Sequence, residues 1–340
     1  MAHDMVRSPL LGKAQDEWLD LRFGLFACYN INTFYGRGWT DGTCDPAAVN
    51  PRQFDPEQWA AAAKAAGMRY AVFVAKHHDG FCIWPTRKTD YNIAASPFKQ
   101  DMLAGMVSAF QDAGLKTGLY YSLWDRHEPS YPDDDAYTRL VKDQLTELLS
   151  DYGPMVEIMF DGAWDKGNYN WFDLRRWHWE ELYDHIKSLQ PNCLVMNNPT
   201  GAHRGELLTW PVDLNMVECV HFIVNGTELE PDLRPCRGIG MVGRTVEEVT
   251  WPLVHLPVET CDVMGGKWFY TYGPAGPRYR PPETIREWLY TARRYGGNLL
   301  LSVPPAPEGR IDAQACNILS QVGKMLAADD AKRTTMQSET

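Results

Sequence analysis

Residues 71–92 read AVFVAKHHDGFCIWPTRKTDYN, and the character of the chain changes in the middle of this stretch. The apolar run at 71–75 has the pattern of a buried strand, and the ionisable sequence KHHDG follows it directly at 76–80. Ionisable side chains at the end of a buried strand have three explanations: a metal site, a site for a sugar, or an ordinary polar strand end. The other strand ends of the chain distinguish between them.

Apolar runs like this one alternate with amphipathic helical stretches along almost the whole chain. About eight alternations of strand and helix are typical of a (β/α)8 barrel of the TIM type. A doubly wound sheet is the alternative, but it usually has a glycine-rich phosphate-binding turn after its first strand, and ACYNINTF at 27–34 offers none. We therefore predict a (β/α)8 barrel. The predicted strands are 23–31, 68–76, 115–122, 155–160, 193–197, 213–218, 254–260 and 298–303.

The predicted helices lie between these strands, and the helix at 55–66 has clear signals at both ends. Asp55 can cap it, Pro56 fits its first turn, Gln58 can complete a capping box, and Gly67 ends it. The segment 219–253 is long and irregular, so the sixth and seventh units are the least regular. The other predicted helices are 101–113, 136–151, 171–189 and 283–295.

Length and charge narrow the possible partners. The chain has 340 residues and 44% hydrophobic content, enough for one large core or for two domains. Its net charge is −11 with no basic block, so we expect neither nucleic acid nor a membrane surface as a partner. No stretch reaches the ~18 consecutive apolar residues that a membrane span requires. The sequence does not indicate an oligomeric state.

The N-terminus and the cysteines predict a cytoplasmic location. Residues 1–18 lack an apolar run long enough for a signal peptide. The eight cysteines are scattered, with no CxxC pair, which is typical of reduced cysteines in a cytoplasmic enzyme. We expect an N-terminal extension at 1–20, a catalytic barrel at 21–328 and a flexible polar tail at 329–340.

Polar and aromatic residues gather at the predicted C-terminal ends of the strands, where (β/α)8 barrels carry their catalytic groups. Carboxylates and a histidine pair framed by Trp and Tyr suit the hydrolysis of a glycosidic bond. That reaction needs one carboxylate as nucleophile and one carboxylic acid to protonate the leaving oxygen. The strand ends carry Asn30, Asn32, His77, His78, Asp79, Tyr121, Trp124, Asp125, Asp161, Asn197, Asn198, Glu218 and Glu259.

Four motifs, in this order, resemble the alpha-L-fucosidase family, glycoside hydrolase family 29. The resemblance extends from about residue 22 to about residue 325, and GGNLLLSVPPAPEGRI at 296–311 is similar to the closing strand and loop of the family. The motifs are KHHDGFCIWPTRKTDY at 76–91, GLYYSLWDRH at 118–127, IMFDGAW at 158–164 and LPVETCDVMGGKWFY at 256–270.

The resemblance implies a retaining mechanism on a (β/α)8-like barrel, often followed by a β-sandwich. Because the chain ends where that sandwich would begin, we expect the barrel without it. Asp161 matches the family's nucleophile and Glu259 its general acid/base, while His77 and His78 match a pair that hydrogen-bonds sugar hydroxyls. The resemblance and the strand ends together predict further substrate-binding residues: Tyr121, Trp84, Asn30, Trp39, Trp124, Trp268 and Glu218.

Two assignments stay open. Glu218 also ends a predicted strand and is the alternative to Glu259 as the acid. A metal-dependent hydrolase using His77, His78 and Asp79 is the alternative to a sugar site, although adjacent residues of an extended segment point to opposite sides and rarely bind one ion. Neutral imidazole can both donate to and accept from a sugar hydroxyl, so we assign His77 and His78 to sugar binding. We therefore expect no metal and no cofactor.

The substrate expected from the resemblance is an oligosaccharide or glycoconjugate with a terminal α-L-fucosyl group. Three positions depart from the family pattern at sugar contacts: Cys28 stands for a histidine, Gly38 for a glutamate and Met159 for a tryptophan. Each change removes a polar or stacking contact. A related sugar such as an α-L-galactoside is therefore the second expectation, and a carbohydrate-binding barrel with little turnover is the third.

Overall fold

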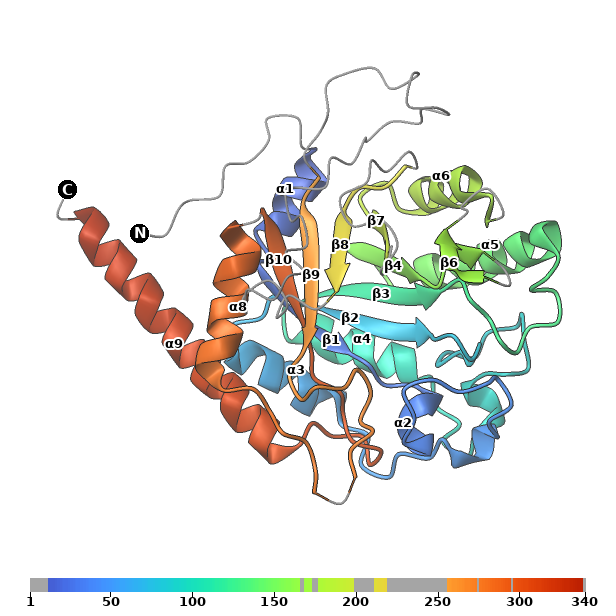
Figure 1. Ribbon diagram of the computed structural model, residues 1–340, viewed down its shortest axis with the longest axis horizontal. Coiled ribbons are helices and arrows are strands. Elements are labelled where there is room, and N and C mark those ends of the chain that lie inside the picture. The colour runs from blue at the N-terminus through green and yellow to red at the C-terminus, as the bar shows by residue number, and fades with distance from the viewer. Residues whose placement is uncertain are drawn as a thin grey trace.

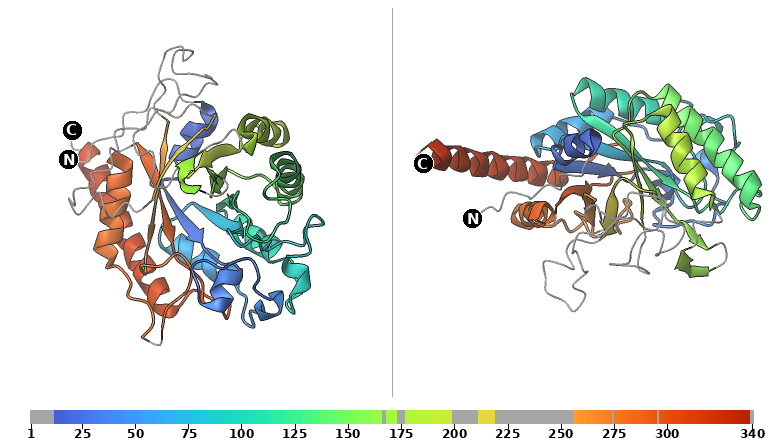
Figure 2. Two further views of the ribbon diagram at one scale, coloured as in Figure 1. Left: turned by 45° about the vertical axis from the view of Figure 1, so that its right-hand side comes forward. Right: turned by 90° about the horizontal axis from the view of Figure 1, so that it is seen from above.

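The computed structural model describes residues 12–165, 168–172, 177–198, 211–218, 256–273, 275–294 and 296–338. Its main sheet has eight strands in the order β7-β4-β3-β2-β1-β10-β9-β8, and every pairing is parallel (Figures 1 and 2). The two outer strands of this order, β7 and β8, contact each other, so the sheet curves into a nearly closed barrel. The strands are β1 Phe23–Ala27, β2 Tyr70–Lys76, β3 Lys116–Ser122, β4 Glu157–Asp161, β7 Leu194–Asn197, β8 Asn215–Glu218, β9 Val258–Val263 and β10 Gly297–Ser302.

The predicted (β/α)8 barrel is confirmed, and each of the eight predicted strands overlaps one of these eight. The helices lie outside the barrel wall (Figure 1). They are α1 Lys13–Leu19, α2 Ile31–Tyr35, α3 Pro56–Ala65, α4 Met102–Asp112, α5 Asp134–Asp151, α6 Trp179–Leu189, α8 Pro282–Arg294 and α9 Ala313–Ser338.

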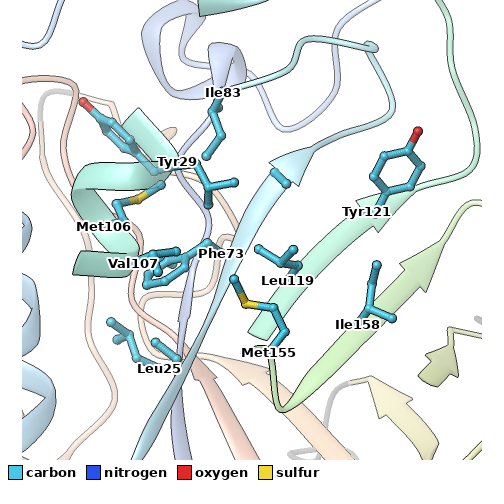
Figure 3. Close-up of a cluster of buried hydrophobic side chains, with 14 of the residues drawn as sticks. Leu25, Tyr29, Phe73, Ile83, Met106, Val107, Leu119, Tyr121, Met155 and Ile158 are labelled. Atoms are coloured by element: carbon cyan, nitrogen blue, oxygen red, sulfur yellow. The ribbon is translucent and has the colours of Figure 1, made fainter. Parts of the chain in front are cut away.

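Side chains alternate between two buried layers along each strand. On β3, Tyr120 lies in the barrel interior, whereas Leu119 and Tyr121 lie in the layer between the strands and the helices. Figure 3 shows this outer layer, in which Leu119 and Tyr121 lie among side chains of the neighbouring strands, such as Phe73 and Ile158. Alternation therefore decides which residues of a strand can reach a site at the barrel mouth.

Helix α3 shows how the local sequence sets an element. The Asp55 carboxylate accepts a hydrogen bond from the Gln58 N–H at 2.9 Å, which is the predicted cap. The predicted capping box does not form, because the Gln58 side chain hydrogen-bonds the backbone of Ile311 instead. Gly67 follows the helix with φ of +81°, a conformation that glycine adopts without strain.

Three other expectations differ from the structure. The helix predicted at 171–189 begins at Trp179, and the short strand β6 (Asn168–Phe172) pairs with β5 (Trp164–Asp165) before it. Helix α9 continues to Ser338 and extends beyond the barrel, so most of the expected tail is helical (Figure 2). The flexibility of that tail stays a prediction.

The expected N-terminal extension contributes to the barrel. Helix α1 buries Trp18 and Leu19, and both belong to the interior cluster of the barrel. The Trp18 indole N–H donates to Glu157 at the beginning of β4. Residues 12–20 therefore close the end of the barrel at which the strands begin. None of the described helices is long and apolar enough to cross a membrane.

Candidate active site

Asp161 ends β4 and is held by three hydrogen-bond donors at the barrel mouth. The Tyr120 hydroxyl donates to Asp161 Oδ2 at 2.6 Å, and the Gly162 N–H donates to Oδ1 at 2.7 Å. The Asn198 amide, just after β7, donates weakly to Oδ1 at 3.4 Å. Gly162 has φ of +71°, and a Cβ there would lie 2.7 Å from the Cβ of Trp124, so glycine alone permits this turn.

Burial raises the pKa of Asp161 above its ordinary value, and the hydrogen bonds from Tyr120 and Gly162 oppose that shift. The carboxylate is thus removed from water, 8% exposed, and oriented by protein donors. An oriented carboxylate at the end of a barrel strand can attack an electrophilic carbon placed in the mouth.

His78 lies beside Asp161 and is fixed by Ser122. The Nδ1 of His78 is 2.6 Å from Ser122 Oγ, and the Ser122 hydroxyl donates to the Trp124 carbonyl at 2.7 Å. Because the single hydroxyl proton is directed to that carbonyl, His78 Nδ1 must carry the proton in this pair. The other nitrogen, Nε2, is then an acceptor, and it lies 3.6 Å from Asp161 Oδ2.

Burial lowers the pKa of His78 well below its usual value, and His77 and Arg126 add to the shift. A neutral imidazole at this position can accept a hydrogen bond from a hydroxyl group and is suited to a sugar. His77 packs against it, with ring centroids 4.1 Å apart, and also contacts Phe269 and Tyr120.

An aromatic wall borders the histidines. The ring of Trp39 lies 5.2 Å from the His78 ring and 5.5 Å from the Trp124 ring. Trp39 is 54% exposed and is the one exposed large hydrophobic side chain among the described residues, whereas Trp124 is buried beneath Arg126. An exposed indole beside a polar pocket offers a stacking surface for the C–H face of a sugar ring.

Glu259 lies away from this site, at the end of the barrel where the strands begin, so the geometry does not support its assignment as the general acid. It is the second residue of β9, and the hydroxyl of Tyr70, the first residue of β2, donates to its Oε1 at 2.7 Å. It lies beside Glu157, the first residue of β4. Asp161 is the last residue of the same strand. Four residue steps of ~3.3 Å place the two ends of β4 about 13 Å apart.

The two glutamates form a buried carboxyl pair at the beginning of the strands. Burial raises the pKa of Glu259 well above its ordinary value, and the charge of Glu157 raises it further. The atoms Glu157 Oε1 and Glu259 Oε2 are buried and have no conventional hydrogen-bond partner in the described structure. One proton between the two carboxyl groups satisfies both oxygens.

Three other predicted substrate-binding residues have their polar side-chain groups bonded within the protein. The Tyr121 hydroxyl bonds Gln144 at 2.5 Å in the outer layer, and the buried Trp84 indole donates to Glu147 at 3.0 Å. The Asn30 side chain hydrogen-bonds the backbone at three points. These contacts give the three residues structural roles.

The remaining predictions divide according to position. The partly buried Trp268 packs on Phe26, and Phe26 also contacts Tyr120. The Phe26 ring therefore separates Trp268 from Tyr120, which donates to Asp161. The backbone of Glu218 ends β8, at the same end of the barrel as Asp161. Cys28 and Met159 line the barrel interior, and a Cβ added at Gly38 would meet no atom within 4 Å.

The sequence analysis did not single out three residues that build the site, namely Tyr120, Ser122 and Phe269, which contacts His77. Two of them could have been found from the alternation of side chains along β3, because Tyr120 and Ser122 face the barrel interior as Asp161 does. Across the described ranges, His77, His78 and Asp79 do not form a group that could hold a metal ion.

A (β/α)8 barrel with a hydrogen-bonded aspartate, a histidine pair and exposed tryptophan at its mouth has the architecture of the barrel glycoside hydrolases. The chain belongs to the alpha-L-fucosidase family, whose model matches residues 27–330.

The chain is also similar to two plant proteins described as alpha-L-fucosidases and to a solved structure of glycoside hydrolase family 29. Putative alpha-L-fucosidase 1 of Oryza sativa subsp. japonica is 43% identical over 162 residues, which are 47% of this chain and 31% of that protein. Alpha-L-fucosidase 1 of Arabidopsis thaliana is 28% identical over 323 residues, 93% of this chain and 60% of that protein. The crystal structure of a glycoside hydrolase 29 family member from an unknown rumen bacterium is similar with a TM-score of 0.73 and 29% identity, over 94% of this chain and 57% of the other. The chain thus spans less than two thirds of the length of each.

Proposed function

We propose that this chain is a retaining α-L-fucosidase that hydrolyses terminal α-L-fucosyl linkages of oligosaccharides or glycoconjugates. The observation that carries the proposal is the placement of Asp161, which is fixed by Tyr120 and the Gly162 N–H beside His78. Membership of the alpha-L-fucosidase family supports the choice of sugar.

In this mechanism Asp161 attacks the anomeric carbon and the glycosidic oxygen leaves with a proton from a carboxylic acid. A covalent glycosyl-enzyme forms, and water then releases the sugar with the same configuration as in the substrate. His78 accepts a hydrogen bond from a sugar hydroxyl through Nε2, and Trp39 covers the apolar face of the ring. No metal or cofactor takes part in these steps.

Glu218 is the proposed general acid/base, because its backbone ends β8 at the barrel mouth while Glu259 lies at the other end. A retaining pair has carboxyl groups about 5–5.5 Å apart. Only a carboxyl group at the barrel mouth can lie that close to Asp161.

The proposal is tested with 4-nitrophenyl α-L-fucoside and 4-nitrophenyl α-L-galactoside, using wild type and Asp161→Gly. We expect the fucoside to have the higher kcat/KM and Asp161→Gly to be inactive on both. Azide should then restore turnover of Asp161→Gly and give the glycosyl azide of inverted configuration, since azide attacks from the side that the carboxylate occupied. Faster turnover of the galactoside would show that the sugar is wrong, and an active Asp161→Gly would show that the nucleophile is wrong.

A cytoplasmic location is a further proposal, and it is supported by the scattered spacing of the cysteines in the sequence. Fractionation of the source cells tests it: activity in the soluble intracellular fraction is expected, and activity in the secreted fraction would contradict it.

A further inference from the structure

A cavity lies at the opposite end of the barrel from Asp161. We call it the basal cavity; its volume is about 750 Å³, and it opens where β1, β2 and β3 begin, against helices α8 and α9. Those two helices lie side by side (Figure 1). This volume is within the range of about 300–1,000 Å³ that is usual for small-molecule sites.

The charge of the basal cavity is opposite to that of the chain. The whole chain carries −11, but the lining of the cavity contains six cationic side chains and one carboxylate, Asp330. Asp330 is already paired with Arg333 at 2.6 Å. The cations are Arg22, Lys64, Arg69, Lys116, Arg293 and Arg333.

Three of these cations are neighbours on adjacent strands. Arg22, Arg69 and Lys116 immediately precede or begin β1, β2 and β3. Backbone hydrogen bonds from Arg69 N to Phe23 O and from Lys116 N to Arg69 O, each 2.9 Å long, connect them. Because neighbouring strands are about 4.8 Å apart, the three backbones lie within roughly 10 Å of one another.

This arrangement is not explained by internal pairing. Among the described residues, the side chains of Arg22, Lys64 and Lys116 make neither an ion pair nor a hydrogen bond, and Arg69 donates only to the carbonyl of Asp20. The dipoles of α3 and α8 account for Lys64 and Arg293, which lie in the last turns of those helices. They do not account for the three cations at the strand starts, whose like charges repel one another.

The floor of the cavity is apolar. Phe23, Leu289 and Leu326 line it together with Ala327, which is exposed on α9. A small inorganic anion would pair with the cations but would leave this apolar floor exposed to water. The ligand that fits both features has negative groups for the rim and an apolar or ring-shaped body for the floor.

We propose that the basal cavity binds a small organic anion with at least two negative groups, of about the size of a nucleoside diphosphate. The negative groups lie against Arg22, Arg69 and Lys116, and the body of the molecule lies against the floor. This site is separate from the barrel mouth and does not depend on the proposed glycosidase activity.

Adenosine diphosphate is the first probe, and inorganic pyrophosphate is the second because it has the charge without the body. Calorimetry with the full chain should give a dissociation constant below about 1 mM for adenosine diphosphate. Pyrophosphate should bind at least about tenfold more weakly, and added salt should weaken both. Asp161→Asn should bind adenosine diphosphate as wild type does, since the two sites are at opposite ends.

Two kinds of variant test the assignment. Arg69→Glu and Lys116→Glu change exposed side chains and should each weaken binding about tenfold or more. Arg139→Glu, at an exposed position of α5 outside the cavity, is the matched control and should bind normally. Ala327→Trp fills the cavity without changing its charge and should also reduce binding. The proposal is overturned if adenosine diphosphate does not bind, if pyrophosphate binds equally well, or if the cavity variants bind as Arg139→Glu does.

Discussion

The hydroxyl of Tyr120 lies 2.6 Å from Asp161 Oδ2, whereas Tyr121, the next residue, bonds Gln144 outside the barrel wall. The side chains of two adjacent tyrosines of one strand thus lie in two different layers. The first of them contacts the proposed nucleophile, and the second connects β3 to helix α5.

This pair gives a matched experiment. Tyr120→Phe removes a donor to a carboxylate, and such hydrogen bonds contribute about 1.5–3 kcal/mol, so kcat/KM should fall roughly 10- to 150-fold. The donor stabilises the ionised form, so its loss should raise the pKa of Asp161, and the acidic limb of the pH profile should move to higher pH. Tyr121→Phe deletes the same atom and should leave both quantities unchanged. An unmoved acidic limb in Tyr120→Phe would contradict the role of this hydroxyl.

Trp39→Ala tests the stacking surface. The indole is 54% exposed, so its removal should change the melting temperature little. Loss of stacking on the sugar should raise KM, by roughly tenfold if the contact contributes about 1.5 kcal/mol. Steady-state kinetics and a melting curve measure the two effects. A large fall in melting temperature with an unchanged KM would show that Trp39 is a structural residue.

The glutamate pair at the base of the barrel predicts a pH-dependent stability. Burial raises the pKa of Glu157, and burial together with the charge of Glu157 raises the pKa of Glu259. The folded state therefore holds a proton that the unfolded chain releases above the ordinary glutamate pKa of about 4.5. The folded state binds more protons in that range, and stability therefore falls as the pH rises above about 4.5. The slope is at most about 1.4 kcal/mol per pH unit for one proton.

Glu259→Gln isolates this effect, because the amide supplies a permanent donor to Glu157 and needs no shared proton. Unfolding in denaturant at several pH values should show a flatter dependence than wild type above pH ~4.5. Fucosidase activity at neutral pH should be retained, since Glu259 is at the opposite end from Asp161. A loss of activity without a loss of stability would return Glu259 to the catalytic residues.

The same residue shows what limited the sequence reasoning. The apolar run predicted a strand at 254–260, which put Glu259 at its C-terminal end, but β9 spans Val258–Val263. A shift of a few residues in one strand boundary therefore moved a carboxylate from one end of the barrel to the other. Strand existence followed from composition, whereas strand boundaries depended on pairing with β8 and β10.

The tyrosine pair shows a second limit. The strand predicted at 115–122 agrees closely with β3, yet Tyr121 was chosen instead of Tyr120. Strands of a parallel barrel are buried on both faces, so GLYYS has no polar alternation to mark the inner face. The predicted positions of Asp161, His77 and His78 at strand ends agree with the structure, because a strand end depends on chain order and not on which face a side chain occupies.

Gly38→Glu tests the departure from the family pattern. A Cβ added at position 38 would meet no atom within 4 Å, so the substitution should be tolerated. A carboxylate beside Trp39 could accept from a fucose hydroxyl, and we expect kcat/KM for the fucoside to rise roughly tenfold, from a hydrogen bond of about 1.5 kcal/mol. Gly38→Gln is the control for size. An equal rise in both variants, or none in either, would show that the charge at this position does not recognise the sugar.

Glu218→Ala decides which carboxylate is the acid. Nitrophenol leaves without a proton, so formation of the glycosyl-enzyme from 4-nitrophenyl α-L-fucoside should be little affected, while a fucosyl disaccharide should react about 100-fold or more slowly. Hydrolysis of the intermediate also needs the base, and azide should accelerate it. The product should be the glycosyl azide of retained configuration, because azide then replaces water in the second displacement. Asp161→Gly gives the inverted azide, so product stereochemistry separates the two roles. If Glu218→Ala hydrolyses the disaccharide as fast as Glu259→Gln does, the acid is another residue.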